Sequence, residues 1–415
     1  MPFREGDIGL AGRFCAFTFF AYFCVLKQKE MNQEIGLFCE VFPPIMDGVA
    51  VCVQNYAYWM QKKMGAVSVI TPHKNNAHYQ DYDYQILDYM SIPVPGRAPY
   101  VTGVPQLDPV FEYKLHQHQF KIVHAHSPFS TGNLAAQVAK SQGVPMIATF
   151  HSKFKDDFKK EVKYDFVVDQ MLKSVVSVFN KADEVWVPQE SVKEVIREYG
   201  YKGPLEVVEN GSDLAADYPD SYFEDARTAL GIGPDEFVLL FVGQHIWQKN
   251  TRLVIDALER LNDLPFRMFF VGTGYAAGDM KALVHEKGLD SKVTFTGVLT
   301  KREDIVKYYA AADLFLFPSL YDNAPLVVRE AAALHTPSIM LEGSTAATIL
   351  RDGENGFLSP QDLDSFVARV RSLMADRPLV RRVGLTASRS IVRPWSDVVD
   401  EVLDRYDALI ARKSK

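Results

Sequence analysis

The chain has 415 residues, of which 47% are apolar and 23% charged, and its net charge is −7. This length exceeds one ordinary hydrophobic core and predicts two or three domains. The acidic balance excludes the basic composition typical of nucleic-acid-binding domains, so we expect no nucleic-acid partner. Four cysteines without metal-binding spacing are too few for a disulfide framework, and they favour a reducing compartment; they are Cys15, Cys24, Cys39 and Cys52.

Residues 1–30 form an N-terminal extension that contains the apolar run FCAFTFFAYFCVL at 14–26. As a helix this run would be about 20 Å long, too short for a hydrocarbon core of about 30 Å. It also lacks the small-residue cleavage pattern of a secretory signal peptide. We favour a start of the natural chain near Met31, with a short membrane anchor as the alternative.

From residue 33 onward, short apolar segments alternate with amphipathic ones. The first set of expected strands lies at 34–41, 67–71, 122–126, 146–151 and 184–187, and expected helices lie at 48–63, 131–141 and 154–180. After a polar segment at 209–219 the pattern restarts, with expected strands at 237–243, 267–272, 293–297, 314–318 and 338–341. Strands that alternate with helices predict βαβ units and parallel sheets.

The chain is therefore predicted to be an α/β protein with two Rossmann-like, doubly wound domains facing each other across a cleft. We place them at residues 31–210 and 211–394. A last helix, within 395–415, is expected to pack back toward the first domain. Ligands of open α/β sheets bind beyond the carboxyl ends of the strands, which points to the cleft as the site.

Two carboxylates, Asp322 and Glu330, stand eight positions apart in FPSLYDNAPLVVREAAALHTPSIM at 317–340. We expect a helix to begin at Ala324–Pro325, because proline is tolerated in a first helical turn. Free amides there would bind an anion such as a diphosphate, and carboxylates accept hydrogen bonds from sugar and ribose hydroxyls. Taken alone, a surface salt bridge explains the two acids equally well.

The stretch resembles the acidic motif of the retaining GT-B glycosyltransferases of family four, which is two glutamates separated by seven residues. The resemblance covers nearly all of residues 33–411. It implies a cofactor-independent enzyme that moves a sugar from a nucleotide diphosphate to an acceptor with retention. Glu330 would bind the ribose, and the loop before it would contact the rest of the donor through Asp322, Asn323, Ala324, Pro325 and Leu326. Asp322 is shorter than the usual Glu, and residues 323–325 replace a more usual Gly-Phe-Gly.

The segment FVGQHIWQKN at 241–250 is similar to the first strand of the family's C-terminal domain and the basic pair after it. The resemblance places Lys249 at the phosphate-binding lysine, where a cation stabilises the leaving diphosphate without a metal. Gln244 replaces the partner arginine, and this weakens the stabilisation unless Arg252 or another group substitutes. Without the resemblance, Lys249 would be interpreted as a solvated lysine at a helix start.

In the first half, Gly48 of PPIMDGV would allow the backbone to approach the donor phosphate, although a plain turn glycine is the alternative. Three histidines follow consecutive strands, in HAHSPFSTG at 124–132 and ATFHSKFKDDF at 148–158. They invite a zinc interpretation, but sequence spacing supplies no cysteine or carboxylate to join them, and we expect no metal. The resemblance assigns His151 to the reacting end of the donor sugar, with His124 and His126 in the cleft wall or behind it.

GTGYAA at 272–277 fits a dinucleotide fingerprint. It follows the second strand of its domain, and no acidic residue ends the next strand, so hydride transfer is disfavoured. The resemblance instead places Gly274 beside the nucleotide. It also places Val298 and Leu299, in VTFTGVLTKRED at 293–304, near the base.

The segments HSPF and TFHSKFKDDF resemble the branch of the family that glycosylates diacylglycerol and related lipids. KFKDDFKKEVK at 153–163 carries five lysines and predicts a basic amphipathic helix suited to an anionic membrane, with an ordinary solvated helix as the alternative. We expect UDP-glucose as donor, a lipid such as diacylglycerol as acceptor, and a cytoplasmic enzyme peripheral on the inner face of the membrane. A soluble or polysaccharide acceptor, a sugar-nucleotide epimerase and a catalytically weak partner subunit remain alternatives, and the sequence does not indicate an oligomeric state.

Overall fold

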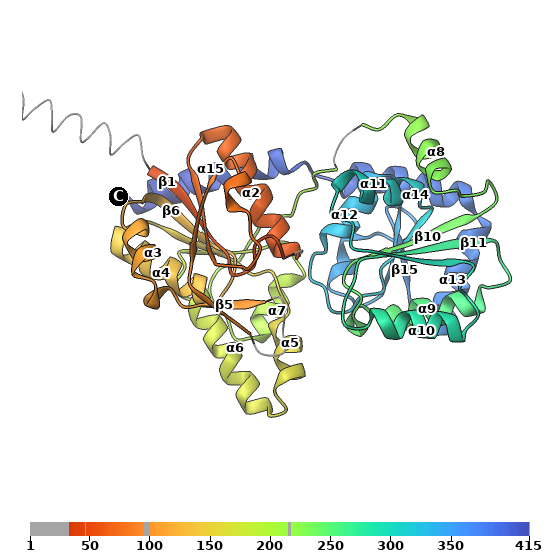
Figure 1. Cartoon of the computed structure of the whole chain (residues 1–415), viewed down its shortest axis with the longest axis horizontal. Helices are drawn as coiled ribbons and strands as arrows, with labels where there is room; N and C mark the ends of the chain where they lie inside the picture. Colours follow the sequence, from red (N-terminus) through yellow and green to blue (C-terminus); the bar gives the residue numbers. More distant parts are fainter. Residues whose placement is uncertain (1–32, 46, 95–99, 215–216, 415) are drawn as a thin grey trace, which may run out of the picture.

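The computed structural model of the chain describes residues 33–45, 47–94, 100–214 and 217–414. Two α/β lobes lie side by side (Figure 1). The expectations for residues 1–30 fall outside the described residues. Among the helices that the structure describes, none is both long enough and apolar enough to cross a membrane.

Within the described residues, the first lobe is built on a seven-stranded parallel sheet with the order β3-β2-β1-β6-β7-β8-β9. Its strands are β1 (Gln33–Phe38), β2 (Val67–Pro72), β3 (Gln85–Tyr89), β6 (Gln119–Ala125), β7 (Met146–Thr149), β8 (Glu184–Val187) and β9 (Glu206–Val207). A separate antiparallel hairpin joins β4 (Ser91–Pro93) to β5 (Val101–Gly103).

In the described part of the second lobe, a six-stranded parallel sheet has the order β12-β11-β10-β13-β14-β15. Its strands are β10 (Phe237–Val242), β11 (Phe266–Val271), β12 (Val293–Gly297), β13 (Leu314–Leu316), β14 (Ser338–Leu341) and β15 (Phe357–Ser359). Every residue of β10 is buried, as expected of a continuous apolar strand at the centre of a parallel sheet. The predicted fold class is confirmed, and all the expected strands are present.

Helices connect the strands and cover the sheets. In the first lobe they are α2 (Gly48–Met64), α3 (Pro109–Leu115), α4 (Ser130–Gln142), α5 (Phe154–Glu161), α6 (Asp165–Phe179) and α7 (Val192–Glu198). The second lobe contains α8 (Asp220–Ala229), α9 (Thr251–Arg260), α10 (Ala277–Glu286), α11 (Arg302–Ala311), α12 (Leu326–Ala333), α13 (Leu363–Ala375) and α14 (Arg377–Ser390). The single helix expected at 154–180 is in fact the pair α5 and α6, and neither glycine nor proline marks the break between them.

Local sequence explains how α2 is placed. Asp47 precedes the helix, and its carboxylate accepts a hydrogen bond from the Val49 amide at 2.8 Å, which is a standard N-cap. Gly65 ends the helix with φ of 70°, a left-handed conformation that favours glycine. The N-terminus of α2 is therefore fixed directly after β1, at the carboxyl edge of the first sheet.

Two segments carry the chain between the lobes, and they lie against each other. The Ser212 amide donates to the Arg393 carbonyl at 2.8 Å. Gly211 packs on Trp395 so closely that a Cβ would lie 2.6 Å from the indole, and only glycine fits there. The final helix, α15 (Trp395–Lys413), then returns to the first lobe (Figure 1), where Trp395 and Tyr406 join its hydrophobic core. We propose this double crossing as the domain boundary.

Candidate active site

The expected site residues follow strands at which the strand order of each sheet reverses. The strand order reverses between β1 and β6 in the first sheet and between β10 and β13 in the second. Gly48 follows β1, Lys249 follows β10 and Asp322 follows β13. Ligands of doubly wound sheets bind at such switch points. The topology therefore places Gly48, Lys249 and Asp322 at the switch points of the two sheets, where ligands are expected to bind.

Lys249 and Asp322 form an ion pair, with Lys249 Nζ 2.5 Å from Asp322 Oδ1. Their side chains are only 13% and 16% exposed. The second carboxylate oxygen of Asp322 accepts a 2.5 Å hydrogen bond from the hydroxyl of Ser319, which is fully buried. The guanidinium of Arg252, the suggested substitute cation, lies 4.8 Å from the centre of the Trp247 ring. Sequence analysis named Lys249 and Asp322 but did not predict that they pair.

Gln244 contacts the first lobe by a hydrogen bond to Tyr100. The Gln244 amide donates to the Tyr100 hydroxyl at 3.4 Å, and that hydroxyl donates to Asp47 Oδ2 at 3.4 Å. Burial raises the pKa of the Asp47 carboxyl, while the Val49 amide and the positive charge of Lys249 oppose the rise. A Cβ at the neighbouring Gly48 would meet no atom within 4 Å, so open space lies beside this part of the loop.

The Asn323–Pro325 loop links the two lobes. Asn323 Nδ2 donates to the His151 carbonyl at 3.0 Å, and Asn210 Nδ2 donates to the Ala324 carbonyl at 3.2 Å. The side-chain oxygen of Asn323 is buried and accepts no hydrogen bond from the part of the chain that the structure describes. Pro325 is the N-cap residue of α12, and Leu326 packs against the first lobe's core. The loop is therefore fixed on both sides, with one amide oxygen left for a ligand.

Glu330 lies in α12 and is buried, with both carboxylate oxygens hydrogen-bonded. Arg302 Nη2 donates to Oε1 at 2.7 Å and the Tyr309 hydroxyl donates to Oε2 at 2.7 Å. Two nitrogens of the Arg302 guanidinium also donate hydrogen bonds to the Asp213 carboxylate. The pKa of Arg302 is raised because Glu330 and Asp213 together outweigh the opposing effect of burial. Each oxygen of Glu330 keeps a second lone pair, so a ribose hydroxyl still has an acceptor.

Sequence analysis missed Arg302 and Tyr309 as neighbours of Glu330. Arg302 lies inside the segment assigned to the base, and Tyr309 follows it in the same helix, but neither spacing nor residue type marks them as partners of Glu330. Their helix, α11, places them seven residues apart, which is two turns and one face of a helix.

Gly274, Val298 and Leu299 lie at the ends of β11 and β12. A Cβ at Gly274 would lie 2.4 Å from the His245 carbonyl oxygen, so backbone packing alone requires glycine there. Val298 is 48% exposed, whereas Leu299 packs partly on the second lobe's core. Over the described parts of the chain, no hydrogen bond connects these three residues to Lys249 or Glu330. Their contact with a nucleotide stays a prediction.

The three histidines differ in their surroundings. His124 is fully buried, with Nδ1 2.6 Å from the Tyr406 hydroxyl and Nε2 2.7 Å from the Thr149 hydroxyl, so it is a core residue. The sequence left open whether His124 lies in the cleft wall or behind it, and its ring points into the layer that α15 covers. His126 Nδ1 lies 3.1 Å from His151 Nε2. Burial lowers the pKa of His151 to about 4, which makes it a neutral hydrogen-bonding group at neutral pH.

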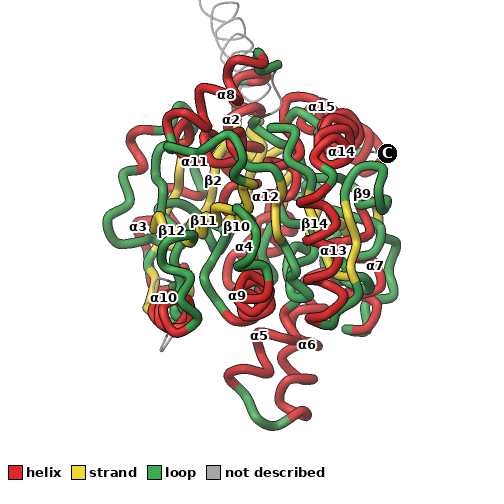
Figure 2. Tube along the Cα trace, turned by 90° about the vertical axis from the view of Figure 1, so that its right-hand side faces the viewer, coloured by secondary structure: helices red, strands yellow, loops and turns green. Residues whose placement is uncertain are grey.

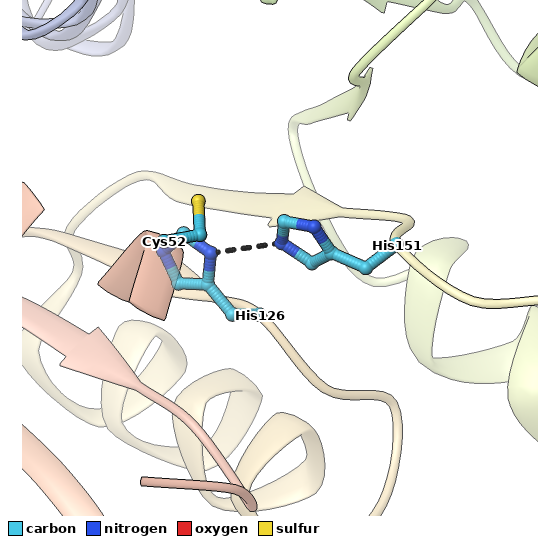
Figure 3. A group of neighbouring side chains, drawn as sticks. All are labelled: Cys52, His126 and His151. Atoms are coloured by element: carbon cyan, nitrogen blue, oxygen red, sulfur yellow. Dashed lines mark hydrogen bonds between the residues drawn. The ribbon is translucent and has the colours of Figure 1, made fainter. Parts of the chain in front are cut away.

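A cysteine joins these histidines, although sequence spacing indicated none. The sulfur of Cys52 and one ring nitrogen each of His126 and His151 all lie within 4.8 Å of one another (Figure 3). Cys52 comes from α2, far from both histidines in the sequence. Only the tertiary structure brings the three together.

Helix α5 contacts the acidic loop of the second lobe. Lys153, just before the helix, donates to the Leu320 carbonyl at 2.9 Å, and the Tyr321 hydroxyl donates to Asp157 at 2.8 Å. The amino group of Lys160 lies 4.4 Å from the centre of the Tyr321 ring. The predicted basic helix therefore also touches the loop that carries Asp322.

Comparisons with known proteins agree with this geometry. The family described as Glycosyltransferase Family 4 matches residues 46–216, and the one described as Glycosyl transferases group 1 matches residues 223–389. Alpha-monoglucosyldiacylglycerol synthase of Streptococcus pneumoniae is 25% identical over 358 residues, which are 83% of this chain and 79% of the relative. Sulfoquinovosyl transferase of Arabidopsis thaliana is 24% identical over 397 residues, 92% of this chain and 75% of the relative.

A solved structure shows the same fold at low sequence identity. HepE of Anabaena, in complex with UDP and glucose, is similar with a TM-score of 0.73 and 16% identity, over 91% of this chain and 99% of HepE. The two family matches together span most of the chain, and each falls on one of the two parallel sheets. The chain therefore belongs to the GT-B glycosyltransferases and is a glycosyltransferase.

Proposed function

We propose that the chain transfers glucose from UDP-glucose, with retention, to a hydroxyl of a membrane lipid such as diacylglycerol. The observation that carries the proposal is the Lys249–Asp322 pair at the switch point of the second sheet. A lysine that is held by a loop carboxylate can exchange that partner for a diphosphate, which carries more negative charge. The name of the glucosyldiacylglycerol synthase relative and the HepE complex with UDP and glucose support the choice of donor and acceptor.

In the proposed reaction each site residue acts on one part of the donor. Lys249 stabilises the charge that develops on the leaving diphosphate, without a metal or other cofactor. The open space at Gly48 admits the phosphates, and Glu330 accepts from the ribose. Gly274, Val298 and Leu299 surround the nucleotide. Neutral His151 hydrogen-bonds the reacting end of the sugar, next to the Asn323–Leu326 loop.

The acceptor side of the proposal rests on the hairpin of α5 and α6. Figures 1 and 2 show the two helices projecting together from the first lobe. At their junction Tyr164 and Phe166 are 68% and 69% exposed, close to the exposed lysines Lys159 and Lys163. Exposed aromatic rings beside lysines suit an anionic membrane interface. We infer a cytoplasmic enzyme that is peripheral on the membrane surface, where sugar nucleotide and lipid meet.

The test is a partition assay with the full chain. Labelled UDP-glucose is added with diacylglycerol in anionic vesicles, and label in the organic phase is measured. We expect transfer, and a loss of about 100-fold in Lys249→Ala, because one electrostatic contact to the transition state is worth roughly 3 kcal/mol. Lys307→Ala is the matched control, since Lys307 is exposed and pairs with Asp304 on α11.

The assay separates the competing functions. Free UDP without labelled lipid would overturn the lipid acceptor but keep the donor site. Release of an isomerised sugar nucleotide without acceptor would favour an epimerase. No turnover with any sugar nucleotide would favour a catalytically weak partner subunit. Equal losses in Lys249→Ala and Lys307→Ala would contradict the role of Lys249.

A further inference from the structure

Three potential metal ligands converge where α2 meets the carboxyl ends of β6 and β7. Cys52 is in the second turn of α2, His126 directly follows β6, and His151 follows β7 by two residues. Figure 3 shows His151 reaching toward the His126 ring, with the sulfur of Cys52 beside that ring. Cys52 and His126 are only 1% and 2% exposed, whereas His151 is partly exposed. The group therefore has a buried base and an accessible side.

The distances are close to those of a tetrahedral site. Zinc with bonds of about 2.1 Å to nitrogen and 2.3 Å to sulfur separates its ligand atoms by roughly 3.3–3.6 Å. His126 Nδ1 and His151 Nε2 are 3.1 Å apart, close to this range. The sulfur of Cys52 lies within 4.8 Å of the nitrogens, so a shift of roughly 1 Å, within reach of side-chain rotation, completes three ligands.

The hydrogen bonds of this group are incomplete. His126 Nε2, the ring nitrogen that does not face His151, is buried and has no hydrogen-bond partner among the described residues. The thiol of Cys52 has one weak contact, 3.8 Å to Asn210 Oδ1. A buried polar atom without a partner costs about 1–3 kcal/mol.

We propose that Cys52, His126 and His151 bind a borderline-soft divalent cation such as Zn²⁺, and that the bound cation inhibits sugar transfer. Thiolate and imidazole are the ligands that zinc prefers, and three protein ligands leave one coordination position open. On binding, the Cys52 thiol releases its proton to solvent and one Zn–S and two Zn–N bonds form, with no change of oxidation state. Inhibition follows because His151 is then no longer available to the donor. That consequence rests on the proposed function, whereas the binding site does not.

Cobalt(II) tests the site without any activity measurement. We titrate the full chain with Co²⁺ and record the thiolate-to-cobalt charge-transfer absorption, which only a cysteine ligand gives. The band is expected in the wild type, lost in Cys52→Ala and retained in Cys39→Ala. Cys39 is the matched control because it is a free, fully buried cysteine outside the group. In case Cys52→Ala is unfolded, His126→Gln is measured too, and we expect cobalt binding weaker by roughly 100-fold with one ligand lost.

Zinc titration of the transfer assay provides the second readout. The fraction of activity lost on adding Zn²⁺ should be large in the wild type and Cys39→Ala and small in Cys52→Ala. A wild type without the band, or a band unchanged in Cys52→Ala, overturns the site. A cobalt band without zinc inhibition overturns the inhibitory role. If the chain transfers no sugar at all, the cobalt result still decides the site, so the two proposals fail separately.

Discussion

Asp322 pairs with the amino group of Lys249, the same group that binds the donor diphosphate in the proposed reaction. The 2.5 Å contact to Lys249 neutralises the lysine in the absence of donor, so binding of UDP must break it. A mostly buried ion pair of this kind is worth about 1 kcal/mol or somewhat more. We predict that Asp322→Asn, which removes the charge but keeps the shape, binds UDP roughly fivefold more tightly, as measured by titration calorimetry.

The control for this prediction is Asp304→Asn. Asp304 pairs with Lys307 on the exposed side of α11, and its substitution should leave UDP binding unchanged. Weaker UDP binding by Asp322→Asn would mean that the carboxylate positions Lys249 for the phosphates and does not compete with them. The sugar contact expected of Asp322 is separate, and would appear as a lower rate of transfer at saturating donor.

At the scale of single residues, candidate site residues could be identified from the sequence, but the side chains that they contact could not. Asp322 stands in a local acidic motif after a strand, and Lys249 was assigned from the family resemblance of the segment at 241–250. Their contact joins positions 73 residues apart, and it depends on how β10 and β13 lie side by side. The Cys52 contact was missed for the same reason, since spacing along the chain says nothing about a helix packed over two later strands.

At the scale of elements, strands at the centre of each sheet were predictable because they are continuous apolar runs. The strands that were missed lie at the sheet edges. β3 is only partly buried, with alternating exposure, and β9 has just two residues, so neither shows an unbroken apolar run. β15 is an edge strand of three residues. The break between α5 and α6 was missed because no helix-breaking residue marks it.

That break creates the surface on which the lipid proposal depends. The junction carries Tyr164 and Phe166, and burial of two aromatic rings at a membrane interface contributes about 1–2 kcal/mol in total. We predict that the double variant Tyr164→Ser, Phe166→Ser binds anionic vesicles roughly tenfold more weakly in a sedimentation assay. Binding of the wild type should fall as salt is raised, because the attraction of the lysines to the lipid surface is screened.

Tyr113→Ser is the matched control for the hairpin variant. Tyr113 is 69% exposed, as much as Phe166, but it lies on α3, which is not part of the hairpin. Unchanged vesicle binding in the hairpin variant, or an equal loss in Tyr113→Ser, would show that the membrane contact lies elsewhere on the molecule.

At the scale of the whole molecule, each lobe has its own hydrophobic core. Helix α15, at the end of the chain, packs into the core of the first lobe. Both lobes also contain buried histidines. His124 and His126 lie in the first lobe, and His245 lies in the second among Phe241, Phe270 and Phe295. The two lobes therefore share one source of acid sensitivity.

The sign of the pH dependence follows from these histidines. Burial lowers the pKa of His151 and of His245 to about 4 and lowers those of His124 and His126 well below the ordinary value, so the unfolded chain binds more protons near pH 6. The contribution of these neutral histidines to stability is fully present above an ordinary histidine pKa of about 6.5. It is lost as the pH falls from there toward about 4. Each such histidine changes the free energy of unfolding by at most about 1.4 kcal/mol per pH unit in this window.

We predict that the free energy of unfolding in urea falls between pH 7.5 and 5, and that His245→Phe makes this fall shallower. Phenylalanine fits the aromatic surroundings and does not titrate. Most carboxylates titrate below this range, so the histidines dominate it. Parallel pH profiles for the wild type and His245→Phe would show that His245 does not contribute, and that the acid sensitivity of the second lobe has another origin.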